Sequence, residues 1–374
     1  MEKAVRVLQV IGIMNRGGAE AMIMNLYRNI DRDKIQFDFV ENTYAEAVFD
    51  EEIRKLGGTI FHCPHFNGKN YVQYKKWWKN FFEEHKGEYQ IVHGHIGSTA
   101  AIYLKEAKKS GVYAIAHSHN SGTDHSIKSF LYNVISYPTR DIADYFFACS
   151  EVAGKDRFGK CVTESSNYRV IHNAIDTSEF RFRSEIRKKT REQLNIGEET
   201  AVIGHIGRFD IQKNHKFLVE IMKAVKDRKQ NTIFLFVGDG ELRPMIEKLV
   251  KEKKIEKNCI FLGVRNDVQD LIQAMDLLVF PSLHEGLPVT LVETQTAGLP
   301  CGITDKVPKE SILTENLVSV MSLEDSAEIW ADHIIGRLGE KRYDRSEEIV
   351  KAGYDISATA KWLEEFYLEK YEQN

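Results

Sequence analysis

Short apolar runs alternate with amphipathic stretches along almost the whole chain. In the first half, runs rich in β-branched and aromatic residues predict strands at Val5–Ile11, Ile35–Val40, Thr59–His62, Ile91–His93, Tyr113–His117, Tyr145–Cys149 and Tyr168–Ile171. The second half repeats the pattern, which predicts strands at Ala201–His205, Ile233–Val237, Ile260–Leu262, Leu277–Phe280 and Pro300–Ile303. Near-continuous apolar strands separated by helices are typical of parallel sheets covered on both faces, so the predicted fold class is α/β.

Two sheets fit the chain better than one. Its 374 residues exceed what one core usually serves, and the polar stretch Asp176–Glu199 separates the two sets of strands. A content of 43% hydrophobic and 28% charged residues is ordinary for a globular protein. The net charge of −4 gives no reason to expect nucleic acid as a partner.

The cysteines and the apolar runs indicate the cellular compartment of the protein. Five cysteines are an odd number, and they are widely spread without a C-x-x-C pair, which argues against a disulfide framework or a zinc ribbon. The apolar run at the start is too short for a signal peptide, and no segment approaches the ~20 apolar residues of a membrane span. We therefore expect a cytoplasmic protein.

The stretch at 280–300 carries two glutamates on either side of a helix start. An apolar strand ends at Phe280, Pro288 suits a first helical turn, and Glu285 and Glu293 are eight residues apart. Eight helical residues rise roughly 12 Å, whereas a glycosidase pair flanks one bond at about 5–9.5 Å. The two carboxylates either hold two parts of one long ligand, or are a solvated helix residue and a partner of the helix dipole. The free N–H groups at Gly286–Val289 would attract a phosphate.

Other unusual residues also follow predicted strands of the second half, where doubly wound sheets bind ligands. Arg208 and Lys213 flank a glycine-containing loop and can point at one spot, which suits a diphosphate, unless they are two solvated surface charges. The turn at 238–241 and the segment Leu262–Val264 are two further junctions of this kind, and the second offers backbone that could frame a base.

The first half offers a glycine turn and two histidine pairs. Gly17 and Gly18 open a helix without the G-x-G-x-x-G fingerprint, so a plain tight turn competes with a phosphate or sugar contact. The pairs at 93–95 and 117–119 each close a strand with both histidines on one side. They could ligate a metal, contact a ligand or be structural, and no further Asp, Glu or Cys completes a metal site. The one D-x-D, at 31–33, is interpreted as charge in a turn.

Residues 69–86 predict a basic and aromatic helix. Its stripe of Tyr71, Tyr74, Trp78, Phe81 and Phe82 is either the buried face of the helix or a contact with a membrane surface.

In this order, the elements resemble the retaining glycosyltransferases of family 4, most closely the branch that acts in bacterial exopolysaccharide and capsule assembly. The resemblance covers most of the chain and rests on the combination VLQVIGIMNRGGAE, IAHSHN, VIHNAID, GRFDIQKN, FVGDGE, FLG and HEGLPVTLVE. It implies a GT-B fold, in which two Rossmann-like parallel-sheet domains face each other across a cleft. The acceptor-side domain would span 1–176, completed by a C-terminal helix at 356–374, and the donor-side domain would span 177–355.

The resemblance also implies a role for particular residues. Glu285 would contact hydroxyls of the donor sugar, and Glu293 the ribose. Arg208 and Lys213 would hold the diphosphate leaving group, and His119 would lie near the transferred sugar. The implied catalytic set is Glu285, His119, Arg208 and Lys213, and the implied donor-binding set is Gly17, Gly18, Arg208, Lys213, Leu262, Val264, Glu285, Gly286, Leu287, Pro288, Val289 and Glu293.

Two positions depart from the pattern of the family. Asn214 replaces the glycine that usually follows the lysine, and His117 leaves open which histidine of its pair faces the sugar.

The expected activity is that of a retaining, metal-independent hexosyltransferase without a cofactor. Its donor would be a nucleotide sugar, with UDP as the expected nucleotide, and its acceptor a saccharide or lipid-linked saccharide for cell-surface polysaccharide. Peripheral contact with the cytoplasmic face of a membrane would go through 69–86. The rival hypotheses are a sugar-nucleotide epimerase on the same fold, a non-enzymatic nucleotide-sugar-binding protein and, least favoured, a metal hydrolase built on the histidine pairs.

Overall fold

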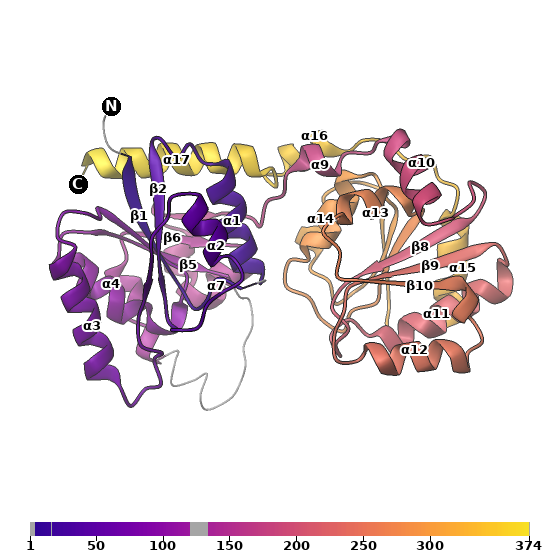
Figure 1. The fold of residues 1–374 in the computed structure, drawn as a ribbon, viewed down its shortest axis with the longest axis horizontal. Coiled ribbons are helices and arrows are strands. Elements are labelled where there is room, and N and C mark those ends of the chain that lie inside the picture. Colours follow the sequence, from indigo (N-terminus) through magenta and orange to yellow (C-terminus); the bar gives the residue numbers. More distant parts are fainter. Residues whose placement is uncertain (1–3, 16, 120–133, 374) are drawn as a thin grey trace. The chain divides into compact units, whose positions relative to one another are not determined.

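A computed structural model describes residues 4–15, 17–119 and 134–373. Arg16 of the glycine turn, Asn120 of the IAHSHN motif and Asn374 lie outside the described residues. The chain forms two compact units (Figure 1): unit 1 comprises Met1–Ala174 with Ile356–Asn374, and unit 2 comprises Ile175–Asp355.

Unit 1 contains a seven-stranded parallel sheet in the order β3-β2-β1-β4-β5-β6-β7. Its strands are β1 (Val5–Ile11), β2 (Ile35–Glu41), β3 (Ile60–His62), β4 (Ile91–Gly94), β5 (Tyr113–Ser118), β6 (Tyr145–Ala148) and β7 (Tyr168–Val170). Its described helices are α1 (Gly18–Asn29), α2 (Asp50–Lys55), α3 (Tyr71–Glu84), α4 (Ala100–Lys109), α6 (Thr139–Ile142), α7 (Glu151–Phe158), α8 (Lys160–Thr163) and α17 (Ile356–Gln373). The long apolar strands are buried on both sides, as the sequence pattern predicted.

Unit 2 contains a six-stranded parallel sheet in the order β10-β9-β8-β11-β12-β13. Its strands are β8 (Ala201–Ile206), β9 (Thr232–Val237), β10 (Cys259–Gly263), β11 (Leu277–Phe280), β12 (Cys301–Thr304) and β13 (Val318–Met321). Its helices are α9 (Thr177–Phe180), α10 (Ser184–Gln193), α11 (His215–Arg228), α12 (Arg243–Glu252), α13 (Val268–Ala274), α14 (Val289–Thr296), α15 (Ala327–Arg337) and α16 (Ser346–Lys351).

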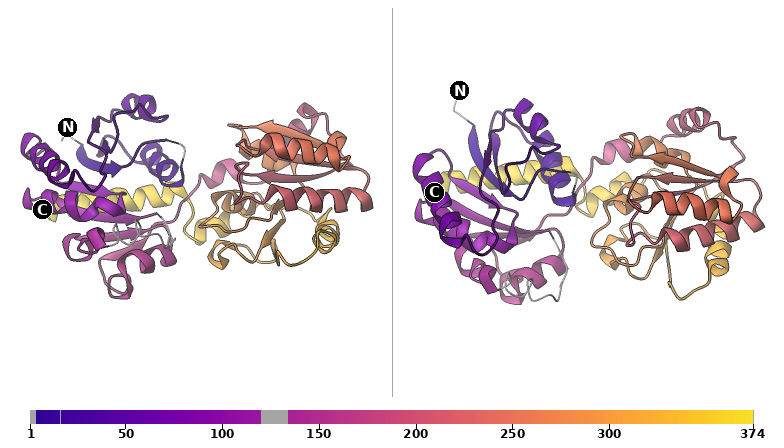
Figure 2. Two further views of the ribbon diagram at one scale, coloured as in Figure 1. Left: turned by 90° about the horizontal axis from the view of Figure 1, so that it is seen from below. Right: turned by 60° about the horizontal axis from the view of Figure 1, so that its bottom comes forward.

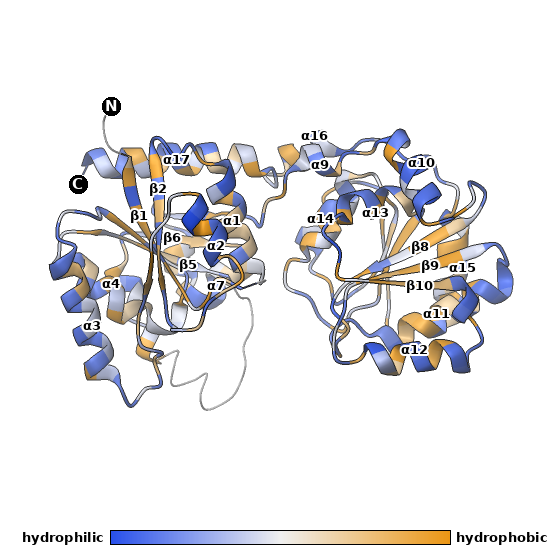
Figure 3. Cartoon of the chain, viewed as in Figure 1, coloured by the Kyte–Doolittle hydropathy of each residue, from blue (hydrophilic) through white to orange (hydrophobic). Residues whose placement is uncertain are grey.

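The predicted α/β class with two Rossmann-like parallel sheets is confirmed. Every predicted strand is present, with ends that differ by a residue or two. The strand that the pattern missed is β13. Its first three residues are only partly buried or exposed, so the sequence has no apolar run there that would predict a strand. In both units the apolar colour gathers along the strands and the polar colour on the outer faces of the helices (Figure 3).

Helix α3 turns its aromatic stripe inward. Tyr74, Trp78, Phe81 and Phe82 are buried in a core with α4, whereas Tyr71 is 45% exposed. The described residues include no helix long and apolar enough to cross a membrane.

The C-terminal helix α17 completes the core of unit 1. It lies alongside that unit in both views of Figure 2 and packs on α1. Its buried residues are Ile356, Ala360, Leu363, Phe366 and Tyr367.

Candidate active site

The carboxyl ends of β8, β9, β10 and β11 meet at one edge of the sheet of unit 2, because the strands are all parallel. Backbone hydrogen bonds join the loops that follow them. The Gly238 N–H donates to the Gly263 carbonyl (2.8 Å), and the Leu283 N–H donates to the Gln212 carbonyl (2.8 Å). The fold therefore places the predicted junctions of the second half along one continuous rim.

The loop after β8 has a conformation that its residue types explain. Gly238 has φ +129°, and a Cβ there would collide with the carbonyl oxygen of Gly207, so this close approach requires glycine. The Asp210 carboxylate accepts a hydrogen bond from the Lys213 N–H at 3.1 Å. Asn214 then takes the left-handed conformation (φ 53°) at the start of α11. Asparagine tolerates that region better than other residues with a Cβ, so it can replace the glycine of the family pattern.

Lys213 and Glu285 form an ion pair at the centre of this rim. The Lys213 ammonium lies 2.7 Å from Glu285 Oε1, and their side chains are only 16% and 6% exposed. The same ammonium lies 4.5 Å from the ring centroid of Phe280, the last residue of β11. The Gln212 amide donates to Glu285 Oε2 at 3.3 Å. The carboxylate is thus held by two residues of the 207–214 loop.

Positive charge without a protein partner lies on the same loops. Arg208 is exposed, and among the described residues its guanidinium has no ion pair or hydrogen bond. Pro288 caps α14 with an extended backbone and without a side-chain hydrogen bond. Across the part of the chain that the structure describes, the N–H groups of Gly286, Leu287 and Val289 have no acceptor. A helix N-terminus beside a cation is suited to bind an anion.

Glu293 lies within α14 and is partly buried. Burial raises the pKa of its carboxyl to about 7, so the group is close to half protonated at neutral pH. No described residue forms a hydrogen bond or an ion pair with its carboxylate. At the end of β10, Val264 is 62% exposed and Leu262 packs partly against the core. Burial argues against the solvated alternative for Glu293, and the contacts of Glu285 with Lys213 and Gln212 go beyond those of a helix-dipole partner.

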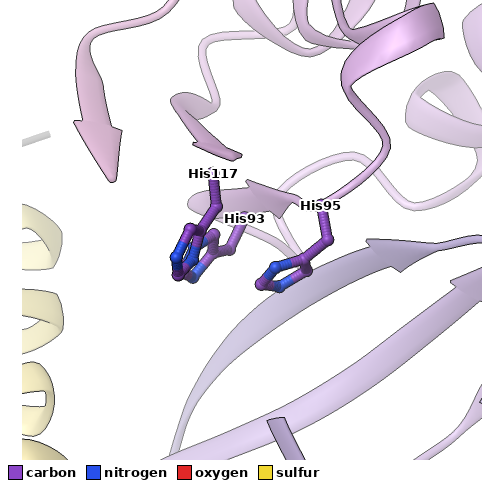
Figure 4. A group of neighbouring side chains, drawn as sticks. All are labelled: His93, His95 and His117. Carbon is purple, nitrogen blue, oxygen red and sulfur yellow. The ribbon is translucent and has the colours of Figure 1, made fainter. Parts of the chain in front are cut away.

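The histidine pairs of unit 1 form two stacked rungs. His93 Nε2 lies 3.1 Å from His117 Nδ1, and His95 Nδ1 lies 2.8 Å from His119 Nε2. The rings of His93 and His95 stack at 4.4 Å, as do those of His117 and His119 at 4.1 Å. Figure 4 shows His93, His95 and His117 projecting to one side of β4 and β5.

Burial lowers the pKa of each of the four histidines, to about 3 for His93 and about 4 for His119. All four are therefore neutral at physiological pH.

The same cluster bears on the metal interpretation of the sequence. His93, His95 and His117 each have a ring nitrogen within 4.8 Å of the others. However, His93 Nε2 and His117 Nδ1 face each other in rings inclined by only 12°, the geometry of an N–H···N hydrogen bond. A metal ion would have to replace that bond. The hydrogen bonds account for the cluster without further ligands.

The glycine turn of unit 1 begins α1. Gly17 is the N-cap, and a Cβ on it would collide with the Glu20 carboxylate that folds back over the helix start. Gly18 lies near Asn173 of the VIHNAID motif, whose amide nitrogen would be 4.0 Å from an added Cβ. The turn at 31–33 is closed by an Asp31 carboxylate that accepts from the Asp33 N–H, and Lys34 pairs with Asp31, which agrees with its interpretation as charge.

Sequence reasoning missed the polar residues that support the predicted ones. Gln212 holds Glu285, Gln9 accepts from His95 Nε2 at 2.8 Å, and the Tyr367 hydroxyl lies 2.6 Å from His93 Nδ1. The available signal was Gln9, a polar residue in the middle of the apolar strand β1.

Comparisons with known proteins give concordant matches over both units. The family model described as Glycosyltransferase Family 4 matches residues 16–179, and the one described as Glycosyl transferases group 1 matches residues 186–355.

A similar relative is the putative glycosyltransferase EpsF of Bacillus subtilis, which is 33% identical over 94% of this chain and 93% of its own. The capsular polysaccharide biosynthesis glycosyltransferase CapH of Staphylococcus aureus is 22% identical over 98% of this chain and 99% of its own. Among solved structures, Anabaena Alr3699/HepE in complex with UDP has a TM-score of 0.77 at 16% identity, covering 98% of this chain and 100% of that one. The same protein in complex with UDP-glucose has a TM-score of 0.73 at 16% identity, covering 97% and 99%.

Proposed function

This chain belongs to glycosyltransferase family 4, and we propose that it transfers a hexosyl group from a UDP-sugar, with retention, to a saccharide or lipid-linked saccharide used in cell-surface polysaccharide. The observation that carries the donor site is the buried Lys213–Glu285 pair beside the unpaired Arg208 and the open start of α14. The name of CapH supports the polysaccharide context, and the HepE complexes support UDP as the nucleotide.

The proposed donor lies along the rim of unit 2. The diphosphate would bind Arg208, Lys213 and the N–H groups at 286–289. Among these positive groups, only Lys213 is already paired with an anion of the described residues, which is Glu285. Glu285 would accept hydrogen bonds from sugar hydroxyls while Lys213 fixes its position at 2.7 Å. Leu262–Val264 would frame the base.

Glu293 is the proposed ribose ligand. Two ribose hydroxyls donating to its carboxylate would favour the charged form and lower the pKa from about 7. Donor binding at pH 7 should therefore release a fraction of a proton, which calorimetry in buffers of different ionisation enthalpy measures. Glu293→Gln should abolish that release. Equal proton release in the variant would contradict the assignment.

The chemistry we propose is departure of a diphosphate through an oxocarbenium-like state. Negative charge then grows on the phosphate, where Arg208, Lys213 and the helix start are already in place to stabilise it. Retention follows when the acceptor hydroxyl attacks from the leaving-group face and the departing phosphate takes its proton. Because these groups supply the positive charge, we propose that no metal is required. Loss of activity in EDTA with recovery in magnesium would contradict this.

The first experiment is a thermal-shift screen of UDP-, ADP- and GDP-sugars. The true donor should raise Tm, since a ligand at 100 times its Kd stabilises by about 2.7 kcal/mol. Lys213→Ala should remove the shift, whereas Lys216→Ala, which changes an exposed lysine in the first turn of α11, should keep it. An unchanged shift in Lys213→Ala would contradict the donor site.

Product analysis separates transfer from the epimerase alternative, which the glycosyltransferase relatives do not favour. A donor incubated without acceptor should stay unchanged or hydrolyse slowly. Glu285→Gln should lower transfer by about tenfold or more if a charged hydrogen bond to the sugar is lost. An epimerised donor would support the rival enzyme.

Peripheral membrane contact remains a proposal about the outer face of α3. Since its aromatic stripe is buried, the contact would rest on Lys75, Lys76 and Lys79. Co-sedimentation with anionic vesicles should fall when the three lysines are replaced by glutamine. Equal sedimentation would contradict the contact.

A further inference from the structure

The two histidine rungs of unit 1 are joined at one end by a single amide. The Gln9 Oε1 atom accepts from His95 Nε2 at 2.8 Å, and the Gln9 side chain also hydrogen-bonds the Tyr367 hydroxyl. Gln9 is 1% exposed in the middle of β1, beside β4, so its amide has little freedom. Gln9 thus contacts His95 directly and is linked to His93 through the Tyr367 hydroxyl.

The orientation of this amide determines where each proton lies. Because Oε1 accepts from His95 Nε2–H, His95 Nδ1 is a lone pair, and it accepts from His119 Nε2–H at 2.8 Å. His119 Nδ1 is then an unprotonated acceptor. This atom is buried and has no hydrogen-bond partner in the described part of the chain. The tautomer of a histidine is set by the bond that its other nitrogen makes.

The second rung runs in the opposite sense. Because the Gln9 oxygen already accepts from His95, its amide N–H is the group left to donate to the Tyr367 oxygen. The Tyr367 O–H then donates to His93 Nδ1, 2.6 Å away, which leaves His93 Nε2–H to donate to His117 Nδ1, 3.1 Å away. His117 therefore ends in an N–H, and it is 2% exposed. Of the pair at 117–119, His119 is the histidine that offers an acceptor nitrogen.

We propose that Gln9 and His95 are positioning residues that hold His119 as the neutral Nε2–H tautomer, so that its Nδ1 accepts a hydrogen bond from a hydroxyl of the sugar substrate. The part about the substrate rests on the proposed function, whereas the tautomer does not. Removal of the Gln9 carbonyl frees His95 to carry its proton on Nδ1, which reverses the rung and turns His119 Nδ1 into a donor.

Nitrogen-15 NMR of the imidazoles tests the tautomers in the whole protein without a substrate. In the wild type, all four histidines should be protonated at Nε2, and His119 Nδ1 should show the shift of a lone-pair nitrogen. A proton on His119 Nδ1 in the wild type would overturn the proposal even if transferase activity is found. Gln9→Leu should move that proton to Nδ1.

The matched control is His93→Leu, which breaks the other rung at an equally buried position of the same sheet. It should leave the His119 tautomer unchanged and kcat/KM within about twofold. Gln9→Leu should lower kcat/KM by about tenfold, the equivalent of one hydrogen bond of about 1.4 kcal/mol. Gln9→Leu in a His119→Ala background should cause no further loss, because Gln9 acts through His119.

Additive losses, or equal losses in Gln9→Leu and His93→Leu, would reduce Gln9 to a structural role and overturn the proposal. If Gln9→Leu does not fold, His95→Asn takes its place in the double-mutant cycle with His119→Ala. This substitution removes the imidazole that joins Gln9 to His119. If His119→Ala itself has full activity while the tautomers are as expected, the role of His119 in the proposed function is what fails.

Discussion

Acid should open unit 1 well before unit 2, because the two units bury different numbers of neutral histidines. Burial lowers the pKa of His93, His95, His117 and His119 below the 6.5 of an unfolded chain. Below pH 6.5 the unfolded state binds protons that the folded state does not. Each such histidine therefore costs about 1.4 kcal/mol of unfolding free energy per pH unit, or about 2 kcal/mol at pH 5.

A buried glutamate in unit 1 acts in the opposite direction. Burial raises the pKa of Glu41 to about 7, above its value in an unfolded chain. Between pH 7 and pH 5 the folded state takes up this proton and the unfolded state does not, which adds about 2 kcal/mol of stability. The four histidines at about 2 kcal/mol each outweigh it, leaving a net loss of about 6 kcal/mol, comparable with the 5–15 kcal/mol that holds a domain together.

Unit 2 has a smaller imbalance. Burial lowers the pKa of His205 well below its usual value and that of His215 to about 4, while it raises that of Glu293 to about 7. The same reasoning gives a net loss of about 2 kcal/mol at pH 5. Ion pairs lower the pKa of surface carboxylates such as Asp31, Glu52 and Glu340, so these groups titrate below this pH window.

Hydrogen exchange followed by mass spectrometry, corrected for intrinsic rates, measures the two units separately at pH 7 and pH 5. Peptides from β1, β4 and β5 should lose protection at pH 5 while those from β8, β9 and β11 keep most of theirs. Glu41→Gln removes the opposing proton uptake and should enlarge the loss in unit 1 to about 8 kcal/mol. Earlier opening of unit 2, or a flatter pH profile in Glu41→Gln, would refute the reasoning.

Three further outcomes concern packing and thiols. Gly298→Ala should lower the free energy of urea unfolding by about 2 kcal/mol or more, because φ at Gly298 is +58° and a Cβ would collide with the Tyr343 carbonyl. The control Gly336→Ala lies inside α15 with open space around it and should be neutral or stabilising. Equal effects of the two substitutions would contradict this. Arg342→Met should cost about 3 kcal/mol or more, since this 9% exposed guanidinium binds four backbone carbonyls at 272, 273, 275 and 297; an unchanged Tm would count against it. Cys161 is the one exposed cysteine among the described residues, so it alone should react quickly with a thiol reagent in the native protein; a second fast thiol would disprove that.

The sequence predicted the sheets well because buried parallel strands are continuous apolar runs, a signal that is local. It also indicated the rim of unit 2, because Arg208, Lys213 and Glu285 each lie in a loop that follows a predicted strand. The partner choices within the rim were not predictable in the same way. Lys213 pairs with Glu285 across 72 residues, whereas Arg208 has no partner among the described residues, and this difference depends on loop geometry that no local pattern encodes.

The histidine rungs show the same limit more sharply. The spacing of the two pairs predicted a shared side of the sheet, and it left metal, ligand and structural interpretations open. What distinguishes the four rings is contact with Gln9 and with Tyr367, and the second lies 274 residues from His93. Only the folding of unit 1 brings these residues together.

The place of helix α17 in unit 1 affects how the protein folds during its synthesis on the ribosome. Unit 1 combines residues 1–174, which emerge before unit 2, with Ile356–Gln373, whose buried side chains belong to its core. The usual order of folding during synthesis, in which the domain that emerges first also folds first, is therefore reversed. Unit 2 is continuous in sequence and can fold before α17 emerges, whereas the apolar side chains of unit 1 that pack against α17 stay uncovered until then. A nascent chain stalled before residue 356 should accordingly be a strong client of chaperones and proteases.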